Sequence, residues 1–104
     1  MRQFYVGVLG LAVKAKPPAL AVRGGCWFVG HGIELHLGVE EPFAPARKAH
    51  PALLWPDLDA LAARLTDAGY PVHWVPDGEL ACLRRFHTED VHGNRLEFLA
   101  TLPS

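Results

Sequence analysis

Residues 57–69 have the sequence of a capped amphipathic helix. Apolar side chains recur there at intervals of three and four residues and so share one face of a helix: Leu58, Leu61, Leu65 and Ala68. Asp57 is placed to cap the start, and Gly69 is placed to end it. We therefore predict a helix from about Leu58 to Ala68.

Short apolar segments on both sides of this helix predict strands. Residues 49–55 form a strand pattern in which His50 shares a face with Ala52 and Leu54, and Pro51 favours an edge or bent position. Three more strand patterns follow the helix and are separated by turn residues: 72–75, 83–88 and 96–99. The order strand, helix and three strands predicts a βαβββ module over residues 49–104.

The first half of the chain repeats this order without an opening strand. Residues 3–9 predict a helix that ends at Gly10, and strand patterns follow near residues 11–14, 26–29 and 33–39. Two local matches support a repeat: Leu9-Gly10-Leu11 beside Ala68-Gly69-Tyr70, and Ile33-Glu34-Leu35 beside Leu96-Glu97-Phe98. We predict an α+β fold of paired modules, with an incomplete first module over residues 1–40 and a linker over 41–48.

Composition limits the function classes. The 104 residues, half of them apolar, fit one small domain. The net charge is −1 and no basic run is longer than Arg84-Arg85, which excludes a nucleic-acid footprint. No apolar run approaches the ~18 residues of a membrane span. Cys26 and Cys82 are isolated and are expected to be reduced thiols, so we predict a cytoplasmic protein with a small-molecule ligand.

Segments along essentially the whole chain resemble the vicinal oxygen chelate superfamily, which includes glyoxalases, bleomycin resistance proteins and extradiol dioxygenases. They are Phe4-Tyr5 with Leu9-Gly10-Leu11, Gly24-Gly25-Cys26-Trp27-Phe28, Glu34-Leu35-His36-Leu37, His50 before Asp57-Leu58, Arg85-Phe86, and Asp90-Val91-His92-Gly93-Asn94-Arg95-Leu96-Glu97. The last is the most specific, although Val91 replaces the usual proline and His92 the usual aromatic residue. The resemblance implies two βαβββ modules that curl into a cup-shaped mixed sheet.

The resemblance also implies a divalent-metal site with ligands on the first and last strands of each module. By position these are His50 and Glu97 in the second module, and Glu34 or His36, which share a strand face, in the first. A fourth ligand is expected on a strand before Met1. A mixed set of histidines and carboxylates suits zinc, iron(II), manganese or nickel.

Each assignment has an ordinary structural alternative. His50 is equally a strand-end histidine bonded to a backbone carbonyl. Glu97 lies in an apolar strand, where an unpaired carboxylate is costly, and this favours metal or catalytic use over a salt bridge to Arg85 or Arg95. The alternation of Glu34 and His36 with apolar residues is also typical of a strand with one solvated face.

Four further residues are expected to line a ligand pocket. Arg85 and His87 share a strand face, as an anion contact and a proton shuttle, although a surface position is the simpler expectation for both. Trp27 is an aromatic candidate for the pocket wall, with core packing as its alternative. Phe43, in the linker, is either a lid or a surface staple.

Two functions follow from the resemblance. In the first, the protein is a metal-dependent lyase, isomerase or dioxygenase, and Glu97 or Glu34 moves a proton while the metal chelates two neighbouring substrate oxygens. In the second, the fold binds a flat ligand without metal and performs no chemistry, as bleomycin resistance proteins do. A decayed site is a third reading. We expect a homodimer in each case, because the cup is open where the first strand is absent.

Overall fold

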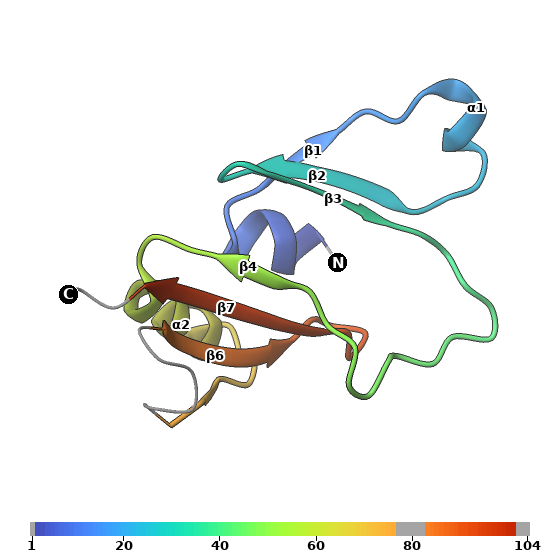
Figure 1. The fold of residues 1–104 in the computed structure, drawn as a ribbon. Coiled ribbons are helices and arrows are strands. Elements are labelled where there is room, and N and C mark those ends of the chain that lie inside the picture. Colours follow the sequence, from blue (N-terminus) through green and yellow to red (C-terminus); the bar gives the residue numbers. More distant parts are fainter. Residues whose placement is uncertain (1, 77–82, 102–104) are drawn as a thin grey trace. The chain divides into compact units, whose positions relative to one another are not determined.

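The computed structural model describes residues 2–76 and 83–101 of the chain. These residues divide into two compact units, Met1–Ala44 and Pro45–Ser104, each of which combines a sheet with helical segments (Figure 1). The α+β class predicted from the sequence is confirmed. In the described parts of the chain, no helix is long and apolar enough to cross a membrane.

The N-terminal unit is a three-stranded antiparallel sheet with two short helical segments. The strands are in the order β1-β2-β3, and the elements are η1 (Gln3–Val8), β1 (Ala12–Lys14), α1 (Pro18–Ala21), β2 (Cys26–Gly30) and β3 (Ile33–Leu37). The helix expected at residues 3–9 is a π-helix, in which Leu9 N donates to Phe4 O, five residues back, at 3.0 Å. The single turn α1 was not expected; Pro18 occupies its first position, where proline needs no N–H partner.

One face of this sheet packs on η1 and the other carries polar side chains. Phe28, fully buried, points toward η1, where its ring stacks on Tyr5 with centroids 5.1 Å apart. Side chains alternate along a strand, so its neighbour Trp27 points the opposite way. The register pairs Trp27 with Lys14 on one side and with His36 on the other, which places all three on the polar face.

The C-terminal unit has the βαβββ order expected from the sequence. Its elements are β4 (Ala52–Leu54), α2 (Leu58–Asp67), β5 (His73–Trp74), β6 (Leu83–Glu89) and β7 (Arg95–Thr101). The sheet order is β4-β7-β6-β5, with β4 parallel to β7 and the other pairs antiparallel. β4 is an edge strand, as Pro51 indicated. Proline has no backbone N–H to donate, so it is tolerated at the edge of a sheet and not in an inner strand.

Helix α2 begins and ends where its caps predicted. Asp57 accepts a hydrogen bond from Ala60 N at 3.1 Å, and the chain leaves the helix through Gly69 at φ +88°. Gly10 follows η1 in the same left-handed conformation, at φ +76°, which supports the repeat between the two halves. The apolar face of α2 packs on β7, and the core of this unit is made by Trp55, Leu61, Leu65, Phe86 and Phe98.

A tight turn sets the register of β6 against β7. The carboxylate of Asp90, which is buried, accepts hydrogen bonds from His92 N at 2.9 Å and from Asn94 N at 3.0 Å. Its second oxygen accepts from Asn94 Nδ2 at 2.8 Å. These bonds hold the turn so that Glu89 pairs with Arg95, and every pairing further along the hairpin follows from that one.

Candidate metal centre

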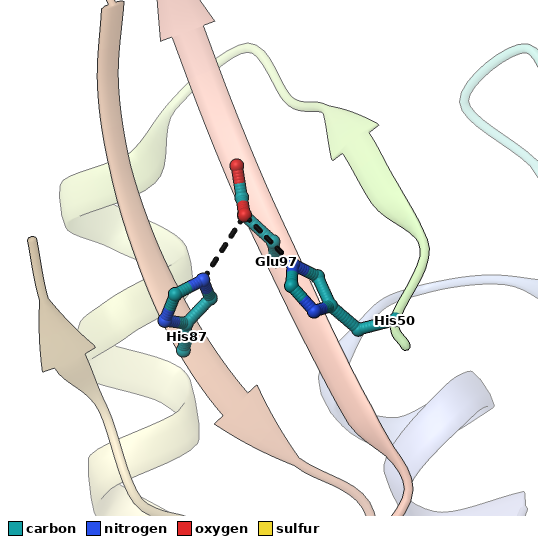
Figure 2. Close-up of side chains that lie close together, drawn as sticks. All are labelled: His50, His87 and Glu97. Carbon is teal, nitrogen blue, oxygen red and sulfur yellow. Dashed lines mark hydrogen bonds and ion pairs between the residues drawn. The ribbon is translucent and has the colours of Figure 1, made fainter. Parts of the chain in front are cut away.

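Three strands of the C-terminal unit bring two histidines to one glutamate. The hairpin register places His87 of β6 directly opposite Glu97 of β7, on the face away from α2 (Figure 2). β4 lies on the other side of β7, and Glu97 N donates to Pro51 O at 2.9 Å. This bond fixes the start of β4, so that His50 points at Glu97 from the opposite side to His87.

Three side chains contact the same oxygen of Glu97. Its Oε1 lies 2.9 Å from His50 Nε2, 3.0 Å from His87 Nε2 and 3.1 Å from Arg85 Nη1. The Glu97 side chain is only 7% exposed. A carboxylate removed from water to this extent needs compensation, which the Arg85 guanidinium supplies as positive charge and the two histidine rings supply as hydrogen bonds.

The backbone fixes the proton on His50. Its Nδ1 lies 2.7 Å from the carbonyl oxygen of Lys48, and a carbonyl only accepts, so Nδ1 carries a proton. Nε2 is therefore the nitrogen presented to Glu97. Nε2 lies 2.9 Å from Glu97 Oε1, within the reach of a shared metal ion. Metal-ligating histidines commonly have this arrangement, with the other ring nitrogen bonded to a carbonyl.

The electrostatics keep Glu97 ionised. Burial raises the pKa of Glu97, but hydrogen bonds from His50 and His87, with the positive charge of Arg85, lower it further than burial raises it. The net result is a pKa below the usual value of 4.5. An ionised carboxylate is the form that binds a metal ion or accepts a proton.

The donor set fits a divalent transition metal. One donor atom each from His50, His87 and Glu97 lies within 4.8 Å of the others, so small side-chain adjustments would bring all three to about 2.0–2.2 Å from one ion. Two imidazole nitrogens and one carboxylate oxygen are the ligands of catalytic zinc sites and of non-haem iron(II) oxygenases. Zinc, iron, manganese and nickel all remain compatible with this set.

The structural alternatives for Glu97 and His50 are both present. The salt bridge of Glu97 forms with Arg85, while Arg95 instead donates to the carbonyl of Arg47. The ring of His50 bonds to the backbone carbonyl of Lys48. The metal or catalytic role of Glu97 and the ligand role of His50 stay predictions.

The remaining predicted site residues belong to the N-terminal unit. Glu34, whose side chain is 40% exposed, accepts from Lys14 Nζ at 2.5 Å and lies 2.7 Å from His36 Nε2. These two hydrogen bonds lower the pKa of Glu34 below its usual value. Trp27 stacks on His36, and Phe43 is exposed. The roles of Glu34 and His36 as ligands, and of Trp27 and Phe43 in a pocket, stay predictions.

From the sequence His87 was expected in a pocket, and it was not among the candidate metal ligands beside Glu97. A signal was available, because the Asp90 to Asn94 turn closes a hairpin and pairs Glu89 with Arg95. Counting back two residues on one strand and forward two on the other places His87 opposite Glu97. The strand patterns alone do not predict this pairing, because the register of the hairpin is set by the turn from Asp90 to Asn94.

Comparison with known proteins gives a family and a set of structural relatives. The family model described as Glyoxalase/Bleomycin resistance protein/Dioxygenase superfamily matches residues 1–98. A protein from Bacillus anthracis assigned to the glyoxalase family is 38% identical with a TM-score of 0.87, over 96% of this chain and 80% of that one. No curated protein sequence matches the chain.

Two further solved structures of similar fold carry different functional names, one for antibiotic binding and one for fosfomycin resistance. TnmS3, an antibiotic binding protein from Streptomyces sp. CB03234, is 25% identical, with a TM-score of 0.73 over 96% of this chain and 83% of that one. The fosfomycin resistance protein FosX from Listeria monocytogenes is 13% identical, with a TM-score of 0.74 over 94% and 78%. At that identity FosX shows a shared fold only.

Proposed function

Because the chain belongs to the glyoxalase, bleomycin resistance protein and dioxygenase superfamily, we propose that it is a divalent-metal-dependent lyase, isomerase or dioxygenase acting on a small oxygen-rich molecule. One observation carries the proposal: two histidine nitrogens converge on one oxygen of a buried, ionised glutamate. A buried donor set of this composition is the kind that catalytic metal sites use.

Each residue of the cluster has a separate task in this proposal. His50, oriented by the Lys48 carbonyl, and His87 hold the ion together with Glu97. When bound, the metal supplies a Lewis acid for two neighbouring substrate oxygens. The low pKa of Glu97 keeps it unprotonated at neutral pH, which both metal ligation and proton acceptance need.

Metal titration tests this proposal directly. Protein purified without chelators, stripped with EDTA and titrated calorimetrically with Zn²⁺, Mn²⁺, Ni²⁺ or anaerobic Fe²⁺ is expected to bind one ion per chain. His50→Ala and His87→Ala are each expected to weaken binding by about a hundredfold, since each removes a ligand. His92→Ala removes an exposed histidine from the β6–β7 turn and serves as the matched control. Absence of stoichiometric binding in the wild type would refute the proposal.

The same titration decides the open assignment in the N-terminal unit. Glu34→Gln and His36→Ala alter exposed side chains whose contacts are with each other and with neighbouring strands. A loss of affinity in only one of them identifies which residue belongs to the metal site. Unchanged affinity in both assigns them to the solvated strand face instead.

Arg85 is expected to oppose metal binding. Its guanidinium lies 3.1 Å from the oxygen that would ligate the ion, so a divalent cation there meets a fixed positive charge at close range. Arg85→Met keeps the aliphatic stem and removes the charge, and the affinity for Zn²⁺ should rise by about tenfold. Arg84→Met, which breaks an exposed ion pair with Asp59, is the control. A fall in affinity would mean that Arg85 holds Glu97 in place for the ion.

A second candidate function is ligand binding without chemistry. Two observations favour it: the similarity to an antibiotic binding protein, and the Arg85–Glu97 ion pair, which already neutralises the buried carboxylate without metal. Under this function Arg85, His50 and His87 form a structural network around Glu97. The metal titration separates the two candidates, because only the first requires a stoichiometric ion.

We also propose that the protein is a homodimer. In the described residues the sheet edges are β1, β3, β4 and β5, and an edge strand presents unpaired backbone groups to another chain. Every residue of β1 is exposed, including Val13. Multi-angle light scattering at micromolar concentration is expected to give twice the mass of one chain, and a monomer would contradict the proposal.

A further inference from the structure

The N-terminal unit has an open hollow of about 280 Å³ beside the end of its sheet. Its walls come from residues 16–39, and the side chains used in the argument are Lys16, Arg23, Trp27 and His36. All of them lie within one unit. The hollow lies just below the usual range of about 300–1,000 Å³ for ligand pockets, which limits an occupant to one or two small rings.

The charge of the hollow favours an anion. Lys16 and Arg23 line it, and none of its described lining residues is a carboxylate. Lys16 Nζ donates to the carbonyl of Gly24, a contact that positions the ammonium group without neutralising it. Arg23 forms no ion pair with any residue in the described ranges. The nearby carboxylate of Glu34, which bonds to His36, is paired with Lys14, so Lys16 and Arg23 give the concave surface a positive potential.

The aromatic wall favours a flat occupant. The Trp27 and His36 rings are stacked, with centroids 3.7 Å apart and planes within 4° of each other. Their positions follow from the strand register, which pairs these two residues directly across β2 and β3. Lys14 Nζ lies over the Trp27 ring, 5.9 Å from its centroid, whereas the side chain of His36 is exposed, so the outer side of the stack is available for an offset-stacked ring.

We propose that this hollow binds a small planar compound that carries a carboxylate or a similar anionic group. The ring lies against the Trp27–His36 stack, and the anion is held by Arg23 and Lys16. Arg23 matters most, because a guanidinium makes paired hydrogen bonds to a carboxylate. The proposal goes beyond the metal cluster, since the hollow contains none of His50, His87 and Glu97 and its occupant needs no ion.

A matched pair of probes tests the proposal on the full-length protein in EDTA. Calorimetric titration is expected to show that 2-naphthoate binds at least about tenfold more tightly than 2-naphthol, which has the same rings and no charge at neutral pH. Arg23→Gln is expected to remove that preference while leaving 2-naphthol binding unchanged. Arg64→Gln, an exposed arginine on α2, is the control for the loss of one positive charge.

A second variant isolates the aromatic wall. Trp27→Leu is expected to weaken both probes by about tenfold, since stacking acts on the rings and not on the charge. Equal affinity for the two probes in the wild type, or unchanged 2-naphthoate binding in both Arg23→Gln and Trp27→Leu, would overturn the proposal. Glu97→Gln is expected to bind 2-naphthoate as the wild type does, so failure of the metal site and failure of this site are distinguishable.

Discussion

Glu97→Gln is expected to weaken divalent-metal binding by at least about a hundredfold while leaving the side-chain shape unchanged. Glu97 Oε1 is the one atom that His50, His87 and Arg85 all contact. The amide oxygen that replaces it carries no charge, so it is a weaker ligand and leaves the ion without a neutralising partner. Calorimetric titration with Zn²⁺ measures the effect, and Glu89→Gln, at an exposed position of the same sheet, is the control.

The same substitution is expected to change the acid stability of the fold. Because the folded-state pKa of Glu97 lies below its unfolded value of 4.5, its ionisation stabilises the fold above about pH 4.5. That contribution is lost as the pH falls through the folded-state pKa. Glu97→Gln removes it, so the variant should lose about 2 kcal/mol at pH 7 and less at pH 3, measured by urea unfolding. An equal loss at both pH values would contradict the assignment of charge to this site.

The local sequence singled out Glu97, because a carboxylate between Leu96 and Phe98 in an apolar strand is costly to bury unpaired. His50 was singled out by its position in the family resemblance and not by its neighbours in the chain. His87 has neither signal, since its importance depends on the strand opposite, and that pairing is fixed by bonds to Asp90 in the turn.

Glu34 and Glu97 have similar sequence patterns but differ in burial, which the pattern did not predict. Each lies between two apolar residues, in segments that match across the repeat, yet the Glu34 side chain is 40% exposed and the Glu97 side chain 7%. The difference comes from position in the sheet. β7 is an inner strand with neighbours on both sides, whereas β3 is the last strand of its sheet. Alternation predicts which face a residue occupies, and strand order decides how deeply it is covered.

The helix predicted at residues 3–9 is present in the N-terminal unit, but its type was not predicted. Helix-like spacing in residues 3–9 does not distinguish an α-helix from a π-helix, because both bury a similar stripe. The choice depends on how the buried rings of Phe4 and Tyr5 meet the sheet, where Tyr5 stacks on Phe28. Such packing involves partners more than twenty positions away and is absent from any local window.

Gly25→Ala is expected to be among the most damaging single substitutions in the N-terminal unit. Gly25 has φ +83°, and a Cβ there would lie 2.1 Å from the carbonyl oxygen of Leu37 and 3.2 Å from Gly38 Cα. Both obstacles are backbone atoms, which cannot rotate away as a side chain can. Backbone strain and overlap together are expected to cost about 3 kcal/mol or more in the free energy of unfolding, measured by urea denaturation.

Gly32→Ala separates the overlap from the strain. Gly32 has φ +77°, nearly the same conformation, but nothing lies within 4 Å of the Cβ position, so only the left-handed backbone should cost, at about 1 kcal/mol. Because Gly25 lies against β3 beside the hollow, its alanine variant should also lose 2-naphthoate binding, and the Gly32 variant should keep it. Similar destabilisation in the two variants would mean that the chain moves away from Leu37 at little cost, and that the wall of the hollow is not held by this contact.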